Sequence, residues 1–247
     1  MQKLYRDLTD SFRRGRGAIS PLTFKRVTSR LNHESEVALM LLQASGYPIE
    51  ESGDIYILKT YSTDYRNQKF CIVDIETNGS KPDNSQVIEI GAVMLQNGRI
   101  IDRFESLIRC DYVPDYITKI TGITTDILRD APTDRDVFQK FRLFLEDSIF
   151  VAHNVNFDFN FLDSSFQKFG LGSIGNFNIC SIKLAKKTIE AERYGLAHLN
   201  NLLNLGVDTH HRAYSDALTT AKLLKIILKK IPEDIETADE LVRFSLT

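Results

Sequence analysis

The stretch FCIVDIETNG, residues 70–79, decides the fold of this chain. Its first seven residues have the β-branched and aromatic character of a strand, and Asn78-Gly79 predicts the turn that ends it. Asp74 and Glu76 stand two residues apart, so the period of a strand directs both carboxylates to one face. Two like charges closing an apolar strand are costly to bury unless a cation neutralises them. Taken alone, the pair can also be explained by an edge strand whose two acids face solvent. Two acids at this spacing often occur by chance, so the spacing alone does not indicate a site.

Further strands and helices are predicted on the carboxyl side of this stretch. Asn97-Gly98 lies between two apolar runs and is the strongest short-range signal for a hairpin. We therefore expect three antiparallel strands in a row. The strands are expected at 70–76, 87–95, 100–108, 149–152 and 177–182, and the helices at 114–120, 137–145, 157–169, 196–203 and 213–231. This order predicts an α/β fold, in which a mixed sheet of an antiparallel three-strand meander plus parallel strands is flanked by helices.

The amino-terminal part of the chain differs from the rest in charge. The 247 residues carry a net charge of −2, yet residues 1–32 hold eight basic and two acidic side chains. A helix at 31–45 with Ser35 as its N-cap, a turn at 49–54 and a strand at 55–58 predict a small helical unit of winged-helix-like form. The asymmetry suggests units with different roles. The expected division is a basic accessory unit (1–66), a main domain (67–231) and a helical tail with acidic residues (232–247).

The composition excludes several classes of protein. Hydrophobic residues make up 43% and charged residues 26%, as in ordinary globular proteins, and a pI of about 6.2 excludes a uniformly basic nucleic-acid binder. Three scattered cysteines cannot form a disulfide framework and favour a reducing, cytoplasmic location. No apolar run approaches the ~20 residues that a membrane span needs, so no membrane association is expected.

Two more acidic positions follow predicted element boundaries. Asp158 ends AHNVNFD (152–158), where a strand gives way to a helix, and Asp216 follows His211 in HRAYSDA (211–217). Taken singly, Asp158 is explained by the preference of helix starts for acids. On one ideal helix, five residues would leave the side chains of His211 and Asp216 about 140° apart. We therefore expect His211 on the loop before the helix and Asp216 one turn inside it.

Together these residues form a recognisable chemical set. Four carboxylates from three segments offer oxygen ligands, which suit Mg²⁺ or Mn²⁺ better than zinc. Two such ions can activate a water and stabilise the leaving oxygen of a phosphodiester. The imidazole of His211 is then a candidate to accept the proton of the attacking water.

Three motifs resemble those of one family. VDIETNG (73–79), AHNVNFD (152–158) and HRAYSDA (211–217) are similar to the exonuclease motifs of the DEDDh branch of the DnaQ-like 3′–5′ exonucleases, within the RNase H-like superfamily. The resemblance covers roughly residues 68–230. Arg212 stands where the sister branch has tyrosine, which favours the histidine branch. Residues 67–231 are accordingly expected to be the exonuclease domain.

The resemblance implies a role for each matching residue. Asp74, Glu76, Asp158 and Asp216 would bind two divalent ions, Mg²⁺ or Mn²⁺, and His211 would be the general base, with His210 a bystander. Substrate contacts would come from Thr77, Asn78, Asn154 and Phe157. Two positions depart from the family pattern, since Asn78 replaces a threonine and Thr121 stands where many relatives have histidine. These departures concern contacts with the substrate end and leave the metal set intact.

The implied reaction releases nucleoside 5′-monophosphates from a single-stranded or frayed 3′ end of DNA, with RNA as an open second substrate. The expected setting is proofreading beside the catalytic subunit of a bacterial replicative polymerase, as the epsilon subunit does in DNA polymerase III. One alternative is a free-standing 3′–5′ exoribonuclease of the RNase T or oligoribonuclease type. Another is a non-catalytic nucleic-acid or polymerase adaptor, against which the complete set of acids argues.

Overall fold

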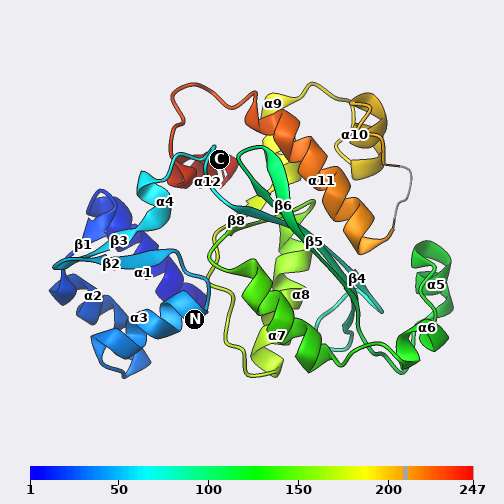
Figure 1. The fold of residues 1–247 in the computed structure, drawn as a ribbon, viewed down its shortest axis with the longest axis horizontal. Coiled ribbons are helices and arrows are strands. Elements are labelled where there is room, and N and C mark those ends of the chain that lie inside the picture. Colours follow the sequence, from blue (N-terminus) through cyan, green and yellow to red (C-terminus); the bar gives the residue numbers. More distant parts are fainter. Residues whose placement is uncertain (208–210, 247) are drawn as a thin grey trace.

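The computed structural model describes residues 1–207 and 211–246 (Figure 1). Its main feature is a five-stranded sheet in the order β6-β5-β4-β7-β8. The strands are β4 (Phe70–Thr77), β5 (Val87–Gln96), β6 (Arg99–Leu107), β7 (Ile149–Ala152) and β8 (Asn178–Cys180). β5 is antiparallel to both β4 and β6, whereas β4, β7 and β8 run parallel. The predicted mixed sheet with an antiparallel meander is confirmed.

The hairpin between β5 and β6 forms as its sequence predicts. Asn97 and Gly98 both have positive φ angles, 51° and 69°, which the turn of a tight two-residue hairpin requires. β5 is buried along almost its whole length, because it lies inside the sheet between β4 and β6. β6 is mostly exposed and forms the edge.

Helices cover both faces of the sheet and give it two apolar cores. Phe70 and Ile72 of β4 pack on one face with Leu224 of α11 and its neighbours. Cys71 and Val73 point to the other face, against a core that includes residues of α7 and α8. The helices of this part are α5 (Asp115–Thr121), α6 (Thr125–Arg129), α7 (Asp134–Leu145), α8 (Val155–Lys168), α9 (Ser181–Thr188), α10 (Leu196–Leu202), α11 (Ala213–Leu228) and α12 (Ala238–Leu246). Within the described residues, none of the helices has the length and apolar character of a membrane span.

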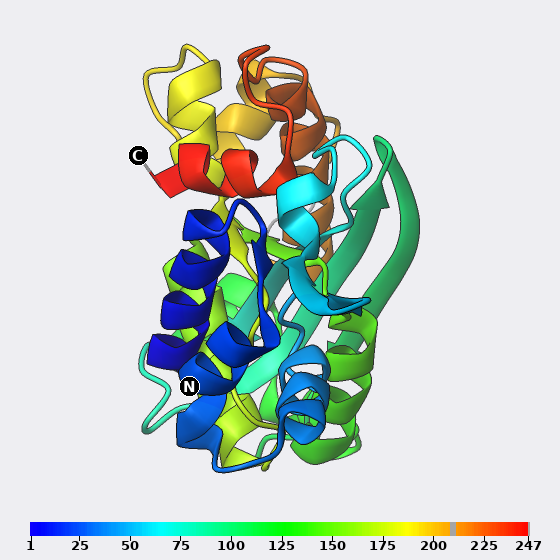
Figure 2. The same ribbon diagram turned by 90° about the vertical axis from the view of Figure 1, so that its left-hand side faces the viewer.

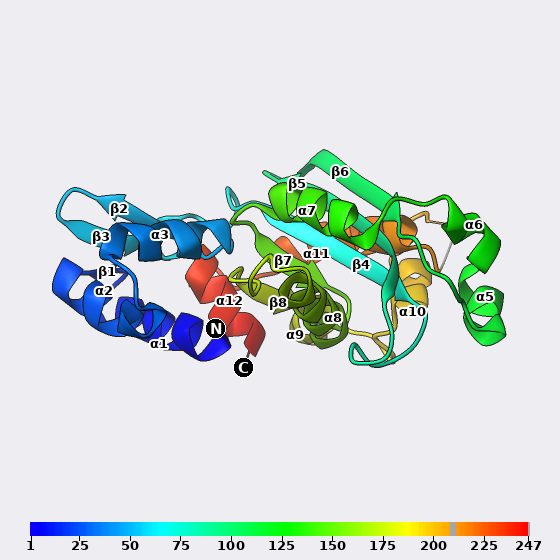
Figure 3. The ribbon, with the colours of Figure 1, turned by 90° about the horizontal axis from the view of Figure 1, so that it is seen from below.

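The amino-terminal residues fold around a core of their own, which Figure 3 shows beside the main sheet. Three short strands form an antiparallel sheet in the order β1-β3-β2. The elements are α1 (Gln2–Arg14), β1 (Ala18–Ile19), α2 (Pro21–Thr28), the 3₁₀ helix η1 (Ser29–Leu31), α3 (Ser35–Ala44), β2 (Ile49–Ser52), β3 (Ile55–Leu58) and α4 (Lys59–Ser62). This order of helices and strands fits the winged-helix-like form expected from the sequence.

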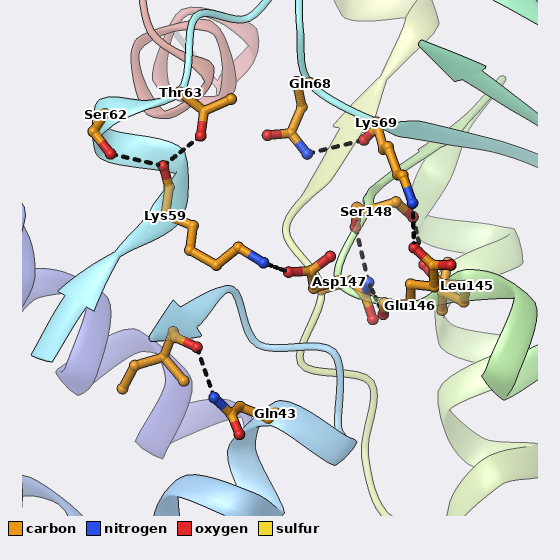
Figure 4. A network of polar contacts seen from close by, with 12 residues as sticks. Gln43, Lys59, Ser62, Thr63, Gln68, Lys69, Leu145, Glu146, Asp147 and Ser148 are labelled. Carbon is orange, nitrogen blue, oxygen red and sulfur yellow. Dashed lines mark hydrogen bonds and ion pairs between the residues drawn. The ribbon is translucent and has the colours of Figure 1, made fainter. Parts of the chain in front are cut away.

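This unit packs against the end of the main sheet where β4 and β7 begin. Lys59 of α4 pairs with Asp147, and next to this contact Lys69, the residue before β4, lies with its Nζ 2.6 Å from Glu146 Oε2 within the main part of the chain (Figure 4). Residues 146 and 147 lie three and two residues before the start of β7. Eight residues of β4 separate this end from the carboxyl end of the strand, a length of about 26 Å.

The last helix lies in the junction between the two parts (Figure 2). α12 contacts α4 on one side and α9 and β8 on the other. The fully buried carboxylate of Asp239 is 2.8 Å from Arg13 of α1 and 3.1 Å from Arg243. The carboxyl-terminal segment is helical only from Ala238 to Leu246, and the packing of this helix connects α1 with the part of the chain that holds the main sheet.

Several expected boundaries were wrong. The segment 49–54, expected as a turn, contains β2, because Ile49–Ser52 pairs with β3 although its sequence IEES has little strand character. The strand expected at 177–182 ends at Cys180, and an unpredicted helix, α9, follows. The helix expected from Leu31 begins only at Ser35, and Glu34, not Ser35, is its N-cap.

Candidate active site

The first two acids lie at the carboxyl end of β4. Asp74 and Glu76 share the face of the strand that α11 covers, because they continue the alternation of Phe70 and Ile72. Both are half-buried. Directly across from Glu76 on β5 stands a third acid, Glu89, which is completely buried.

Asp158 reaches the same place from α8. It lies in the first turn of this helix, which begins at Val155 after Asn154 adopts a left-handed conformation with φ 85°. The side chain of Asp158 is 4% exposed, and its Oδ1 accepts a hydrogen bond of 3.2 Å from the backbone N–H of Ile75. Asp158 is therefore held against β4 between Asp74 and Glu76.

Asp216 and His211 come from the start of α11. Asp216 lies in the first turn, as expected, and its Oδ2 accepts a hydrogen bond of 3.1 Å from the backbone N–H of His211. His211 is exposed, precedes the helix and has a φ of 60°. His210 lies outside the described residues. One ligand atom each from Glu76, His211 and Asp216 lie within 4.8 Å of one another.

Three carboxyl groups of this cluster, those of Asp74, Glu76 and Asp158, have raised pKa values. Burial raises the pKa of Asp74, and the neighbouring charges of Asp158, Asp216 and Glu76 raise it further. Burial also raises the pKa of Asp158. For Glu76, burial, with Glu89 and Asp216 nearby, raises the pKa to about 7.

These shifts have a consequence for stability. Because Glu76 binds its proton more tightly in the folded than in the unfolded chain, folding becomes less favourable as pH rises from about 4.5 to about 7. A divalent cation held by these carboxylates would remove this penalty by neutralising them. The donor set of carboxylate oxygens, with one imidazole beside them, fits Mg²⁺ or Mn²⁺.

The residues expected to contact substrate lie close to Glu76 and Asp158 along the chain, and their roles stay predictions. The Thr77 hydroxyl donates to the Gly79 carbonyl at 2.7 Å. The side chain of Asn78 already has hydrogen-bond partners in two loops, since its amide nitrogen donates to the Tyr112 carbonyl at 3.1 Å and its amide oxygen accepts from the Gln86 N–H at 2.8 Å. The remaining two differ in exposure: Asn154 is exposed and Phe157 is half-buried.

His153 stands in the second motif, yet the sequence alone indicates no role for it. Burial lowers the pKa of its imidazole, which is therefore neutral at pH 7. Nε2 then donates to the Tyr194 carbonyl at 2.9 Å, and Nδ1 accepts from the Ser181 hydroxyl at 2.8 Å. His153 thus joins the end of β7 to α9 and to the loop before α10. The position of His153 next to Asn154 in the second motif is the one sequence feature that could have indicated this role.

This chain is similar in sequence to known exonucleases and polymerases. A family model described as Exonuclease matches residues 71–224. The DNA polymerase III PolC-type of Caldanaerobacter subterraneus is 35% identical over 167 residues, and that of Thermotoga petrophila is 37% identical over 166 residues. These matches cover 67% and 66% of this chain, but the chain spans only 12% of the length of either relative.

Solved structures give the same result. Exonuclease X in complex with 5′ overhanging duplex DNA is 27% identical, with a TM-score of 0.57 over 71% of this chain and 99% of that chain. E. coli Exonuclease I in complex with a dT13 oligonucleotide shares the fold, at 16% identity and a TM-score of 0.60 over 66% of this chain and 41% of that one. By its family match, its relatives and its fold, the chain belongs to the DnaQ-like 3′–5′ exonucleases of the RNase H-like superfamily.

Proposed function

We propose that this chain uses divalent metal to remove nucleoside 5′-monophosphates from the 3′ end of DNA. The observation that carries the proposal is the convergence of Asp74, Glu76, Asp158 and Asp216 at one end of β4, with His211 beside Asp216. Such a cluster of half-buried and buried carboxylates is electrostatically unfavourable unless cations neutralise the negative charge. Membership of the exonuclease family implies the same dependence on divalent metal.

The four carboxylates would hold two ions, Mg²⁺ or Mn²⁺, which would supply an activated water and stabilise the leaving oxygen of the phosphodiester. His211 would accept the proton of the attacking water at its imidazole, for which its exposed position leaves room. The hydrogen bond from the His211 N–H to Asp216 holds the imidazole-bearing residue next to the carboxylate. Phe157, half-buried at the start of α8, would form part of the wall beside the terminal nucleotide.

The comparisons favour DNA over RNA. The relatives are described as DNA polymerase III PolC-type, and the Exonuclease X structure is described in complex with duplex DNA. We propose that the substrate is a single-stranded or frayed 3′ DNA end and that the chain proofreads beside the catalytic subunit of a bacterial replicative polymerase. A free-standing exoribonuclease remains the second candidate, because the same set of carboxylates would serve that reaction.

We also propose that residues 67–231 form the exonuclease domain, residues 1–66 an accessory unit and residues 232–247 a tail. The separate apolar core of the accessory unit supports this division. The contacts of α12 with both parts give the tail a role in fastening them together.

The test is a digestion of oligonucleotides labelled at the 5′ end. The purified chain is incubated with Mg²⁺ or Mn²⁺ and with DNA or RNA whose 3′ terminus is matched or mismatched to a template strand. We expect shortening from the 3′ end of DNA, faster at a mismatched terminus, and none with D74N or in EDTA. D54N, a substitution of the same type at an exposed loop aspartate, is the matched control and should digest DNA normally. Faster digestion of RNA than DNA would favour the second candidate, and full digestion by D74N would refute both.

A further inference from the structure

Glu89 is a buried acid that the proposed chemistry does not use. It lies in the apolar strand β5 and is completely buried. Its Oε1 accepts hydrogen bonds from Arg212 Nη2 at 2.7 Å and Nε at 3.1 Å, and its Oε2 accepts one from the Ala213 backbone N–H at 3.0 Å. Both oxygens therefore already have N–H donors, which argues against a role for Glu89 as a metal ligand.

The partners of Glu89 are the residues that begin α11. Arg212 is the N-cap of this helix and Ala213 its first residue. A carboxylate that accepts the first free N–H of a helix is favoured by the helix dipole. The bidentate pairing with Arg212 also fixes the orientation of the Glu89 carboxylate relative to the helix start, because the guanidinium group is planar. Glu89 thus determines where α11 starts relative to β5.

Gly91 of β5 makes a second contact that determines the position of the start of α11. A Cβ atom at Gly91 would lie only 2.0 Å from the Tyr214 backbone nitrogen, so the first turn of α11 rests directly on this glycine. Gly91 is the cross-strand neighbour of Asp74, and Glu89 is the cross-strand neighbour of Glu76. β5 therefore contacts the start of α11 at the two positions opposite the acids of β4.

The contacts between β5 and the start of α11 act against the electrostatic repulsion among the acids of the site. Asp216, in the first turn of α11, has a carboxylate oxygen within 4.8 Å of one of Glu76. Like charges at this range repel one another, so the ionised cluster pushes the start of α11 away from β4. A fixed attachment of the helix start to β5 keeps Asp216 and His211 in place despite this repulsion.

We propose that Glu89 and Arg212, here called the Glu89 clamp, are positioning residues that hold Asp216 and His211 against Asp74 and Glu76. The proposal rests on the proposed function for the roles of those four residues. Neither residue of the clamp acts on the substrate itself. Loss of a partner that orients a metal ligand typically lowers metal affinity or activity 10- to 100-fold.

The test compares E89Q and R212M with a matched variant elsewhere. D239N also removes the charge of a fully buried carboxylate that pairs with an arginine, but it lies in the junction with the amino-terminal unit. Three quantities are measured well below the melting temperature of each variant: kcat and KM for a 5′-labelled DNA oligonucleotide, the Mn²⁺ concentration for half-maximal activity, and amide hydrogen exchange in peptides covering 213–220 and 238–246.

We expect E89Q and R212M to lower kcat 10- to 100-fold with KM changed less than about 3-fold, and to raise the Mn²⁺ requirement several-fold. Amide hydrogen exchange should become faster in 213–220. The kcat and the Mn²⁺ requirement of R212K should lie between those of wild type and R212M, because lysine keeps the positive charge but lacks the planar guanidinium group that donates two parallel hydrogen bonds. D239N should quicken exchange in 238–246 and leave kcat and the Mn²⁺ requirement unchanged.

Folded E89Q and R212M with wild-type exchange in 213–220 and wild-type kcat would overturn the clamp. R212K keeps a positive charge beside the buried carboxylate of Glu89, so R212K decides the question if E89Q or R212M does not fold. Failure of the proposed function is a different result: the wild-type chain would then be inactive, and the exchange at 213–220 would still show whether the clamp holds α11.

Discussion

Replacing Gly91 with alanine adds one methyl group at the point where β5 touches α11. The new Cβ would lie 2.0 Å from Tyr214 N, 2.2 Å from Ala213 C and 2.4 Å from Tyr214 Cα, all of them backbone atoms. Ordinary contact begins at 3.4 Å, so the start of the helix must move by about 1.4 Å. Asp216 and His211 would move with it. A misplacement of about 1 Å can cost roughly 100-fold in rate, and overpacking typically costs about 1–3 kcal/mol of stability.

The assay measures kcat with a 5′-labelled DNA oligonucleotide and the free energy of unfolding in urea. A92G is the control, because the side chain of Ala92 packs in the core on the opposite face of the sheet. Its loss should cost about 1–2 kcal/mol of stability without moving α11, so kcat should stay near the wild-type value. A folded G91A variant that turns over like A92G would refute the view that β5 sets the position of α11.

Three further predictions concern charge. Mn²⁺ should raise the melting temperature more at pH 8 than at pH 5.5. The reason is that Glu76, with a pKa raised to about 7, is mostly ionised and repelled by its neighbours only at the higher pH. An equal rise in melting temperature at the two pH values would contradict this. H211A should lower kcat by about 10²- to 10⁴-fold with little change in KM, and an unchanged kcat would remove His211 as the general base. D239N should lower the free energy of unfolding in urea by about 3 kcal/mol, because it breaks a buried ion pair with Arg13; a stability within 0.5 kcal/mol of wild type would be evidence against that role.

The sheet and its acids could be predicted because their signals are local. The alternation of β4 places Asp74 and Glu76 on one face, and Asn97-Gly98 predicts the hairpin that follows. Asp216 could be placed because a helix start can be recognised from its sequence. Bringing Asp158 to the same point required the resemblance of three motifs to one family, since no local pattern connects α8 with β4.

The support of the site could not be predicted in the same way. A single glutamate in the apolar run of β5 gives no sign that Arg212, 123 residues away, pairs with it. The glycine at position 91 likewise reads as an ordinary strand glycine until the helix is seen against it. Both contacts depend on the tertiary arrangement.

The junction with the amino-terminal unit had no sequence signal either. Arg13 belongs to a segment that reads simply as basic, whereas in the structure it pairs with a buried aspartate of the last helix. Lys59 of this unit contacts Asp147, which lies 88 residues further along the chain. Charge asymmetry predicted a separate unit, but the partners of its charges are set by packing.

The most direct test of the central claim is the identity of the first product released from DNA. A single-stranded oligonucleotide with a labelled 3′-terminal nucleotide is mixed with the wild-type chain or D158N in Mg²⁺, and the products are separated within the first turnover. The account predicts that wild type releases the labelled nucleoside 5′-monophosphate first and that D158N releases none at a comparable rate. Labelled fragments of several nucleotides from wild type, or equal release by D158N, would contradict it.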